Sequence, residues 1–204
     1  MMAATTPIVV MAKAPVAGYA KTRLAPALGA DGAARLAARL LDHALTQALA
    51  AALGPVTLAA APSATHPAFD RWRTLPVSIV DQGDGDLGQR MSRAIDAALT
   101  GARGVLLAGS DAPALGAAGF AAAARALDDH DAVFVPALDG GFALVGVTRA
   151  ADVLFEGIAW STPHVMAATR ERLRAFGWRH AELAPVPDID EPADLAALPA
   201  GFLA

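Results

Sequence analysis

Residues 7–26 have the sequence Pro7-Ile-Val-Val-Met-Ala-Lys-Ala-Pro-Val-Ala-Gly-Tyr-Ala-Lys-Thr-Arg-Leu-Ala-Pro26, in which a short apolar run leads into small residues and cations. The apolar run predicts a buried strand. Both lysines of the chain, Lys13 and Lys21, lie in the segment that follows, and Arg23 is beside them. Gly18 would let backbone N–H groups approach an anion, and the next helix would add its positive N-terminal end. We predict a phosphate-binding loop; an ordinary loop with solvated cations is the alternative.

Length and composition narrow the class of protein. The 204 residues contain no low-complexity stretch and no repeat, which predicts a single domain over residues 1–204. Alanine supplies much of the 55% apolar content, so the helices should pack closely on small side chains. Because the chain has no cysteine, disulfides, thiolate metal sites and a cysteine nucleophile are excluded.

Charge and hydropathy indicate a small-molecule partner. A net charge of -4 provides no basic surface for nucleic acid. The first apolar run is too short to span a bilayer, and no basic segment precedes it, so we expect no membrane association and a cytoplasmic protein.

Strands and helices alternate along the predicted chain. This alternation is typical of a mainly parallel sheet covered by helices on both faces, a three-layer α/β/α fold. Asp139-Gly140-Gly141 is typical of a hairpin turn, so we expect one antiparallel strand after it. The predicted strands are 8–11, 56–61, 77–80, 105–108, 132–135, 143–147 and 179–184. The predicted helices are 31–54, 65–73, a segment ending near 99, 115–127, 166–176 and one after 194.

Two segments that follow predicted strands are candidates for substrate contacts, because ligands of open α/β sheets lie outside the carboxyl ends of strands. The first, Asp81–Met91, is rich in glycine and opens a helix. We expect its Gln82, Gly83 and Gly88 to contact the substrate or cofactor. Asp84 and Asp86 are either polar ligands or residues that form the turn. The second segment contains Asp111, held between Gly109 and Pro113, which is positioned either to coordinate a hard cation or to cap a tight turn.

Two later segments are also candidates. Asp188 and Asp190 alternate along an extended backbone, so one of them would face a metal while the other caps the terminal helix, and either could be the ligand. We expect Ser161 or Thr162 to cap the helix over 166–176, with Pro163 in its first turn. His164 then has a structural or peripheral role.

Taken together, these segments resemble the nucleotide-diphospho-sugar transferase superfamily with its GT-A-like fold. Within it, the chain resembles bacterial arsenosugar-biosynthesis or selenodomain-associated glycosyltransferases. There are departures, since Phe142 stands where that family usually has Tyr, and Glu191 and Ala193 alter the motif after Asp190. The matching stretches are 13–26, 82–91, 109–113, 139–142, 155–162 and 188–195.

The resemblance implies the roles of individual residues. Lys13, Lys21 and Arg23 would hold a di- or triphosphate. Asp111, with Asp188 or Asp190, would bind Mg²⁺ or Mn²⁺. Asp139 would contact the acceptor or act as the base, since it lies at the sheet edge beside Gly140-Gly141. A divalent ion and fixed cations stabilise a phosphate leaving group best in the transition state.

Three functions are compatible with this pattern. The first is a metal-dependent glycosyltransferase that moves a sugar from a nucleotide sugar to a small-molecule acceptor. The second is an NTP-dependent nucleotidyltransferase that releases pyrophosphate, because small guanylyl- and cytidylyltransferases share the fold and the cationic first loop. The third is a nucleotide-binding module without catalysis. A dinucleotide oxidoreductase lacks support, because no G-x-G-x-x-G follows the first strand. A serine hydrolase lacks support because Gly109-Ser110-Asp111 is not a G-x-S-x-G elbow.

Overall fold

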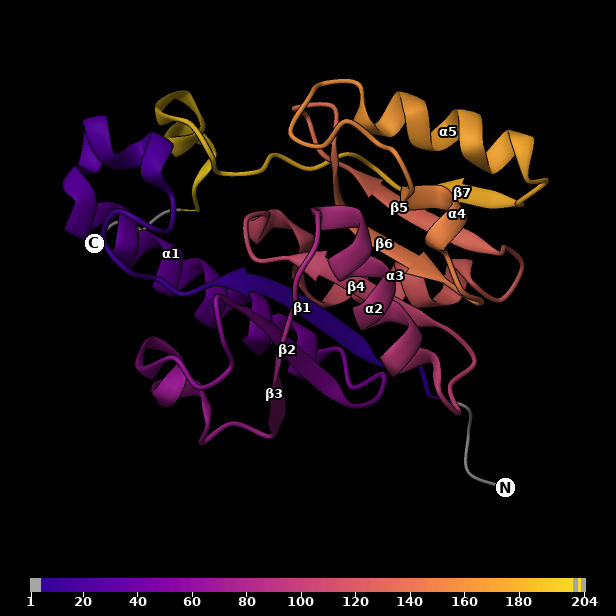
Figure 1. The fold of residues 1–204 in the computed structure, drawn as a ribbon, viewed down its shortest axis with the longest axis horizontal. Coiled ribbons are helices and arrows are strands. Elements are labelled where there is room, and N and C mark those ends of the chain that lie inside the picture. The colour runs from indigo at the N-terminus through magenta and orange to yellow at the C-terminus, as the bar shows by residue number, and fades with distance from the viewer. Residues whose placement is uncertain (1–4, 200–201, 203–204) are drawn as a thin grey trace.

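A computed structural model describes residues 5–199 and 202. One seven-stranded sheet runs through the molecule in the order β3-β2-β1-β4-β6-β5-β7 (Figure 1). The strands are β1 Ile8–Lys13, β2 Val56–Ala61, β3 Val77–Asp81, β4 Val105–Gly109, β5 Ala132–Pro136, β6 Phe142–Val147 and β7 His180–Glu182.

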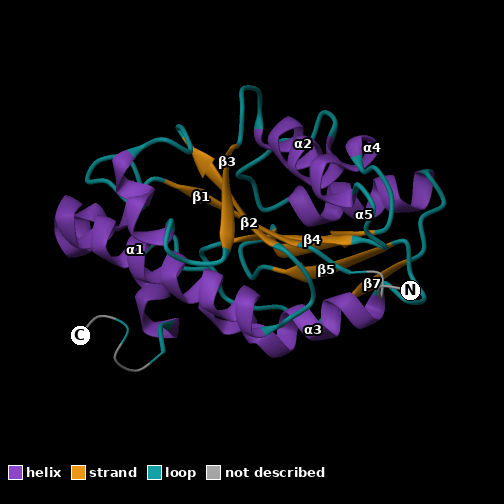
Figure 2. Cartoon of the chain, turned by 90° about the horizontal axis from the view of Figure 1, so that it is seen from below, coloured by secondary structure: helices purple, strands orange, loops and turns teal. Residues whose placement is uncertain are grey.

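Helices cover both faces of the sheet and make three layers (Figure 2). Side chains of α1 and α3 pack against one face, and side chains of α2, α4 and α5 pack against the other. The α-helices are α1 Ala25–Ala50, α2 Leu87–Leu99, α3 Gly116–Ala126, α4 Asp152–Phe155 and α5 Val165–Ala175. The 3-10 helices are η1 Thr22–Leu24, η2 Pro67–Trp72, η3 Pro113–Leu115 and η4 Pro192–Ala197.

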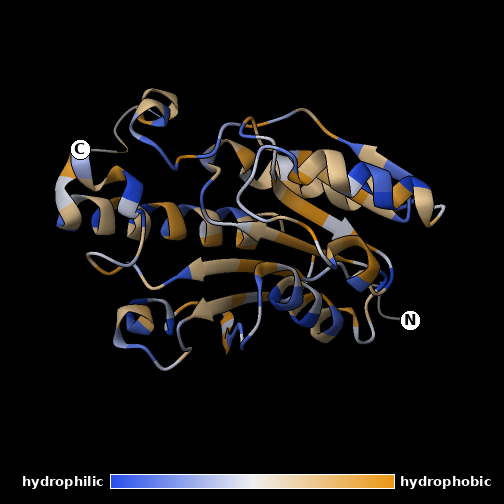
Figure 3. Cartoon of the chain, turned by 45° about the horizontal axis from the view of Figure 1, so that its top comes forward, coloured by the Kyte–Doolittle hydropathy of each residue, from blue (hydrophilic) through white to orange (hydrophobic). Residues whose placement is uncertain are grey.

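The central strands are buried on both faces, which explains why they are continuously apolar rather than alternating. Residues 105–108 of β4 and 132–135 of β5 are all buried. The strands accordingly show hydrophobic colours between helices of mixed polarity (Figure 3). This double-sided burial confirms the expected α/β/α layering.

The antiparallel strand lies inside the sheet. β1 pairs in parallel with β2 and β4, whereas β6 pairs antiparallel with both β4 and β5. The expected hairpin is therefore present, but it is not at a lateral edge of the sheet, because β7 pairs with β5 and forms that edge. The turn bearing Asp139 thus lies near the end of β4 and near Asp111.

Three predicted helical segments differ in detail. Gly29, with φ 71°, interrupts α1, so its long regular part begins close to the predicted start at Asp31 or Gly32. Residues 67–72 and 192–197 form 3-10 helices rather than α-helices. In both, proline occupies the first turn, and each segment is only six residues long.

The predicted cap of α5 is wrong. The helix begins at Val165 with His164 at the N-cap and no side-chain cap bond. Thr162 Oγ1 instead donates to the Ala159 carbonyl (2.8 Å). The reason is tertiary: the backbone of Pro163 packs against Gly140 of the β5–β6 turn, so this segment forms a turn over the hairpin.

No helix within the described ranges combines the length and hydropathy needed to cross a bilayer.

Candidate functional site

The candidate site lies where the carboxyl ends of β1 and β4 meet the β5–β6 turn. Lys21 has a left-handed backbone (φ 52°), and only 5% of its side chain is exposed. Its Nζ lies 2.9 Å from Asp111 Oδ1 and 3.6 Å from Asp190 Oδ1. The nearer contact lacks hydrogen-bond geometry, so the pair is held by charge. A buried ammonium therefore lies between two of the three carboxylates that were predicted as metal ligands.

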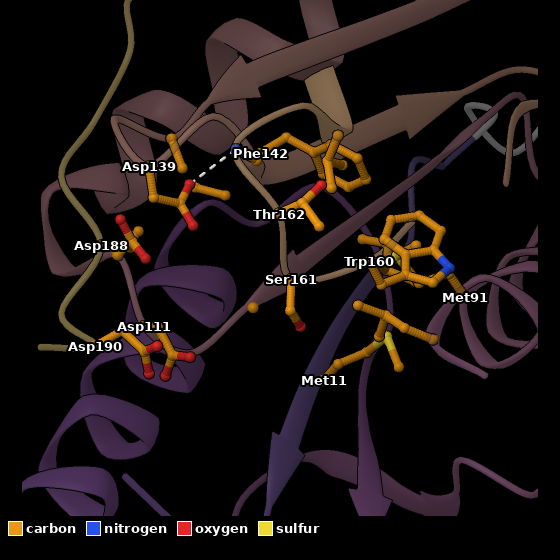
Figure 4. Close-up of a pocket in the computed structure, with 18 residues that line it drawn as sticks. Met11, Met91, Asp111, Asp139, Phe142, Trp160, Ser161, Thr162, Asp188 and Asp190 are labelled. Carbon is orange, nitrogen blue, oxygen red and sulfur yellow. Dashed lines mark hydrogen bonds between the residues drawn. The ribbon is translucent and has the colours of Figure 1, made fainter. Parts of the chain in front are cut away.

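The two late aspartates are positioned by the buried residue between them. Ile189 is fully buried and packs with Leu24 and Leu36, and its N–H donates to the Asp111 carbonyl (2.9 Å). Because successive side chains of an extended chain point in opposite directions, burial of Ile189 directs its neighbours into the site. Asp190 lies beside Asp111, and Asp188 lies nearer to Asp139 (Figure 4).

A second cation and a turn fix Asp190. Arg23 Nη1 donates to Asp190 Oδ2 (2.7 Å). Asp194 Oδ2 accepts from the backbone N–H groups of Asp190 (3.0 Å) and Glu191 (2.7 Å). The prediction that Asp188 or Asp190 caps the terminal helix is wrong, because Glu191 is its N-cap residue. Both aspartate side chains are thus directed into the site.

The Asp139 and Asp188 carboxylates form a second acidic pair. Asp139 Oδ1 accepts from the Gly141 N–H (2.8 Å), which orients its carboxylate. Burial, followed by the nearby charge of Asp139, raises the pKa of Asp188 above its ordinary value. The site therefore contains two carboxylate pairs: Lys21 and Arg23 form ion pairs with Asp111 and Asp190, whereas the Lys21 charge acts on Asp188 only as a minor influence.

The glycine-rich turn mainly supports the site. The Gln82 amide donates to the carbonyls of Ala12 (3.2 Å) and Ala59 (2.9 Å), which ties the ends of three strands together. Asp86 is the N-cap of α2 and accepts from the Gln89 N–H (2.9 Å), so turn chemistry explains it. Arg93 of α2 donates to the carbonyls of Gln82 and Asp84 and holds the turn in place.

The predicted glycines differ in what they contact. Gly83 has a left-handed φ of 74°, and an added Cβ would meet the Arg93 guanidinium. Gly88 packs against the Phe155 carbonyl and the Trp160 ring. Gly18, also left-handed (φ 77°), has open space around its Cα. Two cavities adjoin at this site, and none of the three glycines lines either of them.

Two adjoining cavities open at this site. The larger, about 710 Å³, is lined by Lys13, Lys21, Arg23 and Gln82, and we call it the cationic cavity. The smaller, about 300 Å³, contains all four site aspartates. Asp111, Asp139 and Asp190 line both, so a ligand phosphate in the first cavity would lie beside the second.

The apolar wall of the smaller cavity was not predicted from the sequence. It is formed by Met11 of β1, Met91 of α2 and Trp160. These residues come from distant parts of the chain and follow no common period. The available signals were a methionine within the first strand and a tryptophan at position 160, and neither indicates a site by itself.

The donor set fits a divalent cation. Asp111 and Asp190 already converge on one positive charge, the Lys21 ammonium. Among the described residues, no three His, Asp or Glu side chains are grouped closely enough to hold a metal by themselves. Two carboxylates completed by ligand phosphates are an arrangement that Mg²⁺ commonly uses.

Solved structures confirm the fold. A protein from Desulfovibrio desulfuricans G20, provisionally assigned as a nucleotide-diphospho-sugar transferase, is 28% identical with a TM-score of 0.87, covering 97% of this chain and 89% of that one. A nucleotidyl transferase from Methanothermobacter thermautotroptrophicus is 17% identical with a TM-score of 0.65 and 98% coverage of both chains. A Mycobacterium tuberculosis H37Rv protein solved with manganese is 15% identical (TM-score 0.58), covering 96% of this chain and 98% of that one.

The family comparison agrees with this fold. No curated protein matches the sequence. Residues 29–162 match the model of a family described as "uncharacterized protein conserved in bacteria" (DUF2064). The matched range takes in most of the central strands together with Asp111, Asp139 and Trp160. Since it covers well over half of the sequence, the chain belongs to the DUF2064 family and has the fold of the nucleotide-diphospho-sugar transferases.

Proposed function

We propose that this protein is a metal-dependent glycosyltransferase that moves a sugar from a nucleotide sugar to a small-molecule acceptor. One observation carries the proposal: the cationic cavity and the four-aspartate cavity share the wall formed by Asp111, Asp139 and Asp190. A nucleoside diphosphate bound by the cations would place its sugar across that wall. The 28% identity to a protein provisionally assigned as a nucleotide-diphospho-sugar transferase supports the same activity.

The cations of the first loop hold the diphosphate in this proposal. Lys13 is exposed at the end of β1, whereas Lys21 is buried and Arg23 is more than half exposed. Together they offer one preorganised charge and two that can adjust to the ligand. Positive charge at the leaving oxygen stabilises the transition state more than the ground state, because negative charge gathers there as the bond breaks.

Asp111 and Asp190 are our candidate metal ligands. When bound, Mg²⁺ or Mn²⁺ would neutralise part of the diphosphate charge. Lys21 would then move from the carboxylates toward the phosphate. We assign Asp188 to the pair with Asp139, because Asp190 rather than Asp188 shares Lys21 with Asp111.

Asp139 is our candidate base. An acceptor hydroxyl oxygen would form a bond to the anomeric carbon, and the bond from that carbon to the phosphate oxygen would break. The electron pair leaves with the nucleoside diphosphate, and the hydroxyl proton passes to the Asp139 carboxylate. The hydrogen bond from Gly141 N–H to Oδ1 orients the carboxylate for this transfer.

The experiment that tests the reaction class is phosphorus NMR of a turnover mixture with Mn²⁺. A panel of nucleotide sugars, chosen by thermal shift, would be incubated with candidate acceptors. Release of nucleoside diphosphate is the expected result. Pyrophosphate formation from an NTP would instead establish nucleotidyl transfer, since the same cations would hold a triphosphate. Nucleotide binding that is indifferent to Mg²⁺ and Mn²⁺ would favour a module without catalysis.

Membership of the arsenosugar-biosynthesis or selenodomain-associated group is a narrower part of the proposal. It rests on the motifs at residues 13–26, 109–113 and 188–195. Transfer to an acceptor unrelated to those pathways would remove this assignment and leave the glycosyltransferase intact.

A further inference from the structure

The smaller cavity is divided into an acidic end and an apolar end. Asp111, Asp139, Asp188 and Asp190 gather at one end, and Met11, Met91 and Trp160 face the cavity from the other (Figure 4). Ser161 and Thr162 lie between the two groups. A ligand that fills this cavity must therefore match carboxylates at one end and hydrocarbon at the other.

The apolar end is formed by hydrocarbon, thioether and aromatic side chains, a surface suited to an aromatic or alkyl group. The Phe142 ring lies 6.4 Å from the Trp160 ring and 5.4 Å from the Phe134 ring, both edge to face. These contacts hold the Phe142 and Trp160 rings in place behind the flexible Met11 and Met91 side chains. Leu87, at the start of α2, also lines the cavity and is 43% exposed. Covering such a surface with an apolar ligand is favourable.

The acidic end carries negative charge that the protein only partly offsets. Lys21 and Arg23 pair with Asp111 and Asp190. Within the described residues, no Lys, Arg or His nitrogen lies within 4.0 Å of the Asp139 or Asp188 carboxylate. The described side chains lining this cavity include no cation at all.

We propose that the acceptor is an alcohol with an aromatic or alkyl body and without a phosphate or carboxylate group. Its apolar body would lie against Trp160, Met91 and Met11, and its hydroxyl would donate a hydrogen bond to Asp139. This inference names the acceptor class for the proposed glycosyl transfer and so rests on that function.

The charge of the acidic end decides against anionic acceptors. A phosphate or carboxylate beside Asp139 and Asp188 would be repelled by both, with no cation in the cavity wall to pair with it. In the proposed function, a metal on Asp111 and Asp190 would be shared with the donor diphosphate, and it would not be ligated by Asp139 or Asp188. A neutral hydroxyl is not repelled by the two carboxylates, and it can donate a hydrogen bond to one of their oxygens. A protonated amine on the same body would be attracted, so it serves as a probe of the charge.

Three probes with one shared body test the inference: benzyl alcohol, benzylamine and benzyl phosphate. Binding to the full chain would be measured by saturation-transfer NMR without a nucleotide sugar, and with excess inorganic pyrophosphate to occupy the cationic cavity. We expect the alcohol and the amine to bind at least about tenfold more tightly than the phosphate. Tighter binding of benzyl phosphate, or equal binding of all three, would overturn the proposal.

Variants locate the site of binding. In Asp139→Asn, the preference for benzylamine over benzyl phosphate should fall by about tenfold. The substitution removes a negative charge that attracts the ammonium group and repels the phosphate group. Asp129→Asn, at an exposed position that lines neither cavity, is the matched control and should change nothing. Met91→Ala should weaken all three probes equally. An unchanged preference in Asp139→Asn would contradict the inference even if Met91→Ala fails to fold.

This experiment separates the acceptor class from the reaction. Because the probes are measured without a donor, their order of binding does not depend on which bond the enzyme breaks. Selective binding of the alcohol with no sugar transfer from any donor would sink the proposed function and leave the cavity assignment standing. Sugar transfer to a phosphorylated acceptor would instead overturn the acceptor class and leave the proposed glycosyltransferase function standing.

Discussion

The Lys21 ammonium lies 2.9 Å from the Asp111 carboxylate, and its side chain is almost completely buried. In the proposed function, Lys21 thus lies between the two carboxylates assigned to the metal, Asp111 and Asp190. If Asp111 and Asp190 bind a divalent ion as proposed, Lys21 would compete with that ion for the same two carboxylates, whereas a phosphate ligand would attract both cations. The first-loop lysine and the predicted metal ligands are therefore one coupled unit.

Replacing Lys21 by methionine should strengthen Mn²⁺ binding and weaken nucleotide binding. Two unit charges about 4 Å apart interact by roughly 4 kcal/mol at an effective dielectric constant of about 20. Removing the Lys21 charge relieves part of its repulsion of Mn²⁺, so we expect Mn²⁺ to bind about tenfold more tightly. Calorimetry with Mn²⁺ alone, then with a nucleotide, measures both effects. Lys13→Met is the control: it should weaken nucleotide binding only. Equal Mn²⁺ affinity in Lys21→Met and wild type would show that Lys21 does not compete.

Shortening Ile189 should destabilise the protein and loosen the acidic site. Ile189→Ala removes a fully buried side chain from the cluster with Leu24 and Leu36, at a cost of about 2–5 kcal/mol, whereas Ile189→Val should cost about 0.5–1.5 kcal/mol. Urea unfolding gives both values. If Ile189→Ala proved as stable as wild type, Ile189 would not be the anchor that directs Asp188 and Asp190.

An alanine at position 140 should be far more costly than one at position 101. Both glycines are left-handed, with φ 93° and 75°, so both substitutions pay a similar backbone strain of about 1–2 kcal/mol. An added Cβ at Gly140 would also collide with the Pro163 backbone, whereas at Gly101 it meets open space. Denaturant midpoints of Gly140→Ala and Gly101→Ala provide the comparison. Similar losses would mean that the hairpin and the 160–164 segment separate easily.

The ion pair between α5 and β7 should give a pH-dependent contribution to stability. Arg170 Nε and Nη2 each donate to Glu182 (both 2.7 Å), and this bond lowers the pKa of Glu182 below its ordinary value. A lowered carboxyl pKa stabilises the fold above the unfolded-state pKa, about 4.3, and the contribution is lost as pH falls through the folded-state pKa.

Glu182→Gln should therefore lower the free energy of unfolding at pH 7, by no more than about 1 kcal/mol because the pair is partly exposed. The difference from wild type should shrink toward pH 3. Unfolding curves at the two pH values measure it. A deficit that grows on acidification would have the wrong sign for this pair.

Much of the fold could be predicted from the sequence because its signals are local. Apolar runs separated by helical patterns predict a parallel sheet, and Asp139-Gly140-Gly141 predicts the reversal that leads into β6. The order of the strands could not be predicted, because insertion of β6 between β4 and β5 depends on contacts between segments far apart in the chain. The predicted N-cap of α5 is wrong for a similar reason: contact with Gly140 outweighs the local preference of Ser161 and Thr162 for N-cap positions.

The sequence by itself determined which chemical groups are available at the strand ends: two lysines and an arginine in the first loop, and aspartates at 111, 139, 188 and 190. Only the tertiary structure decided how they are grouped. Burial of Ile189 directs Asp190 to Lys21 and Asp111 and leaves Asp188 with Asp139. The packing of β1, α2 and the segment before α5 brings Met11, Met91 and Trp160 together as an apolar wall opposite the acids. The physical reason is that charge, burial and distance act between side chains in space. Lys21 and Asp190, which are 169 positions apart along the chain, meet here only because the sheet has folded.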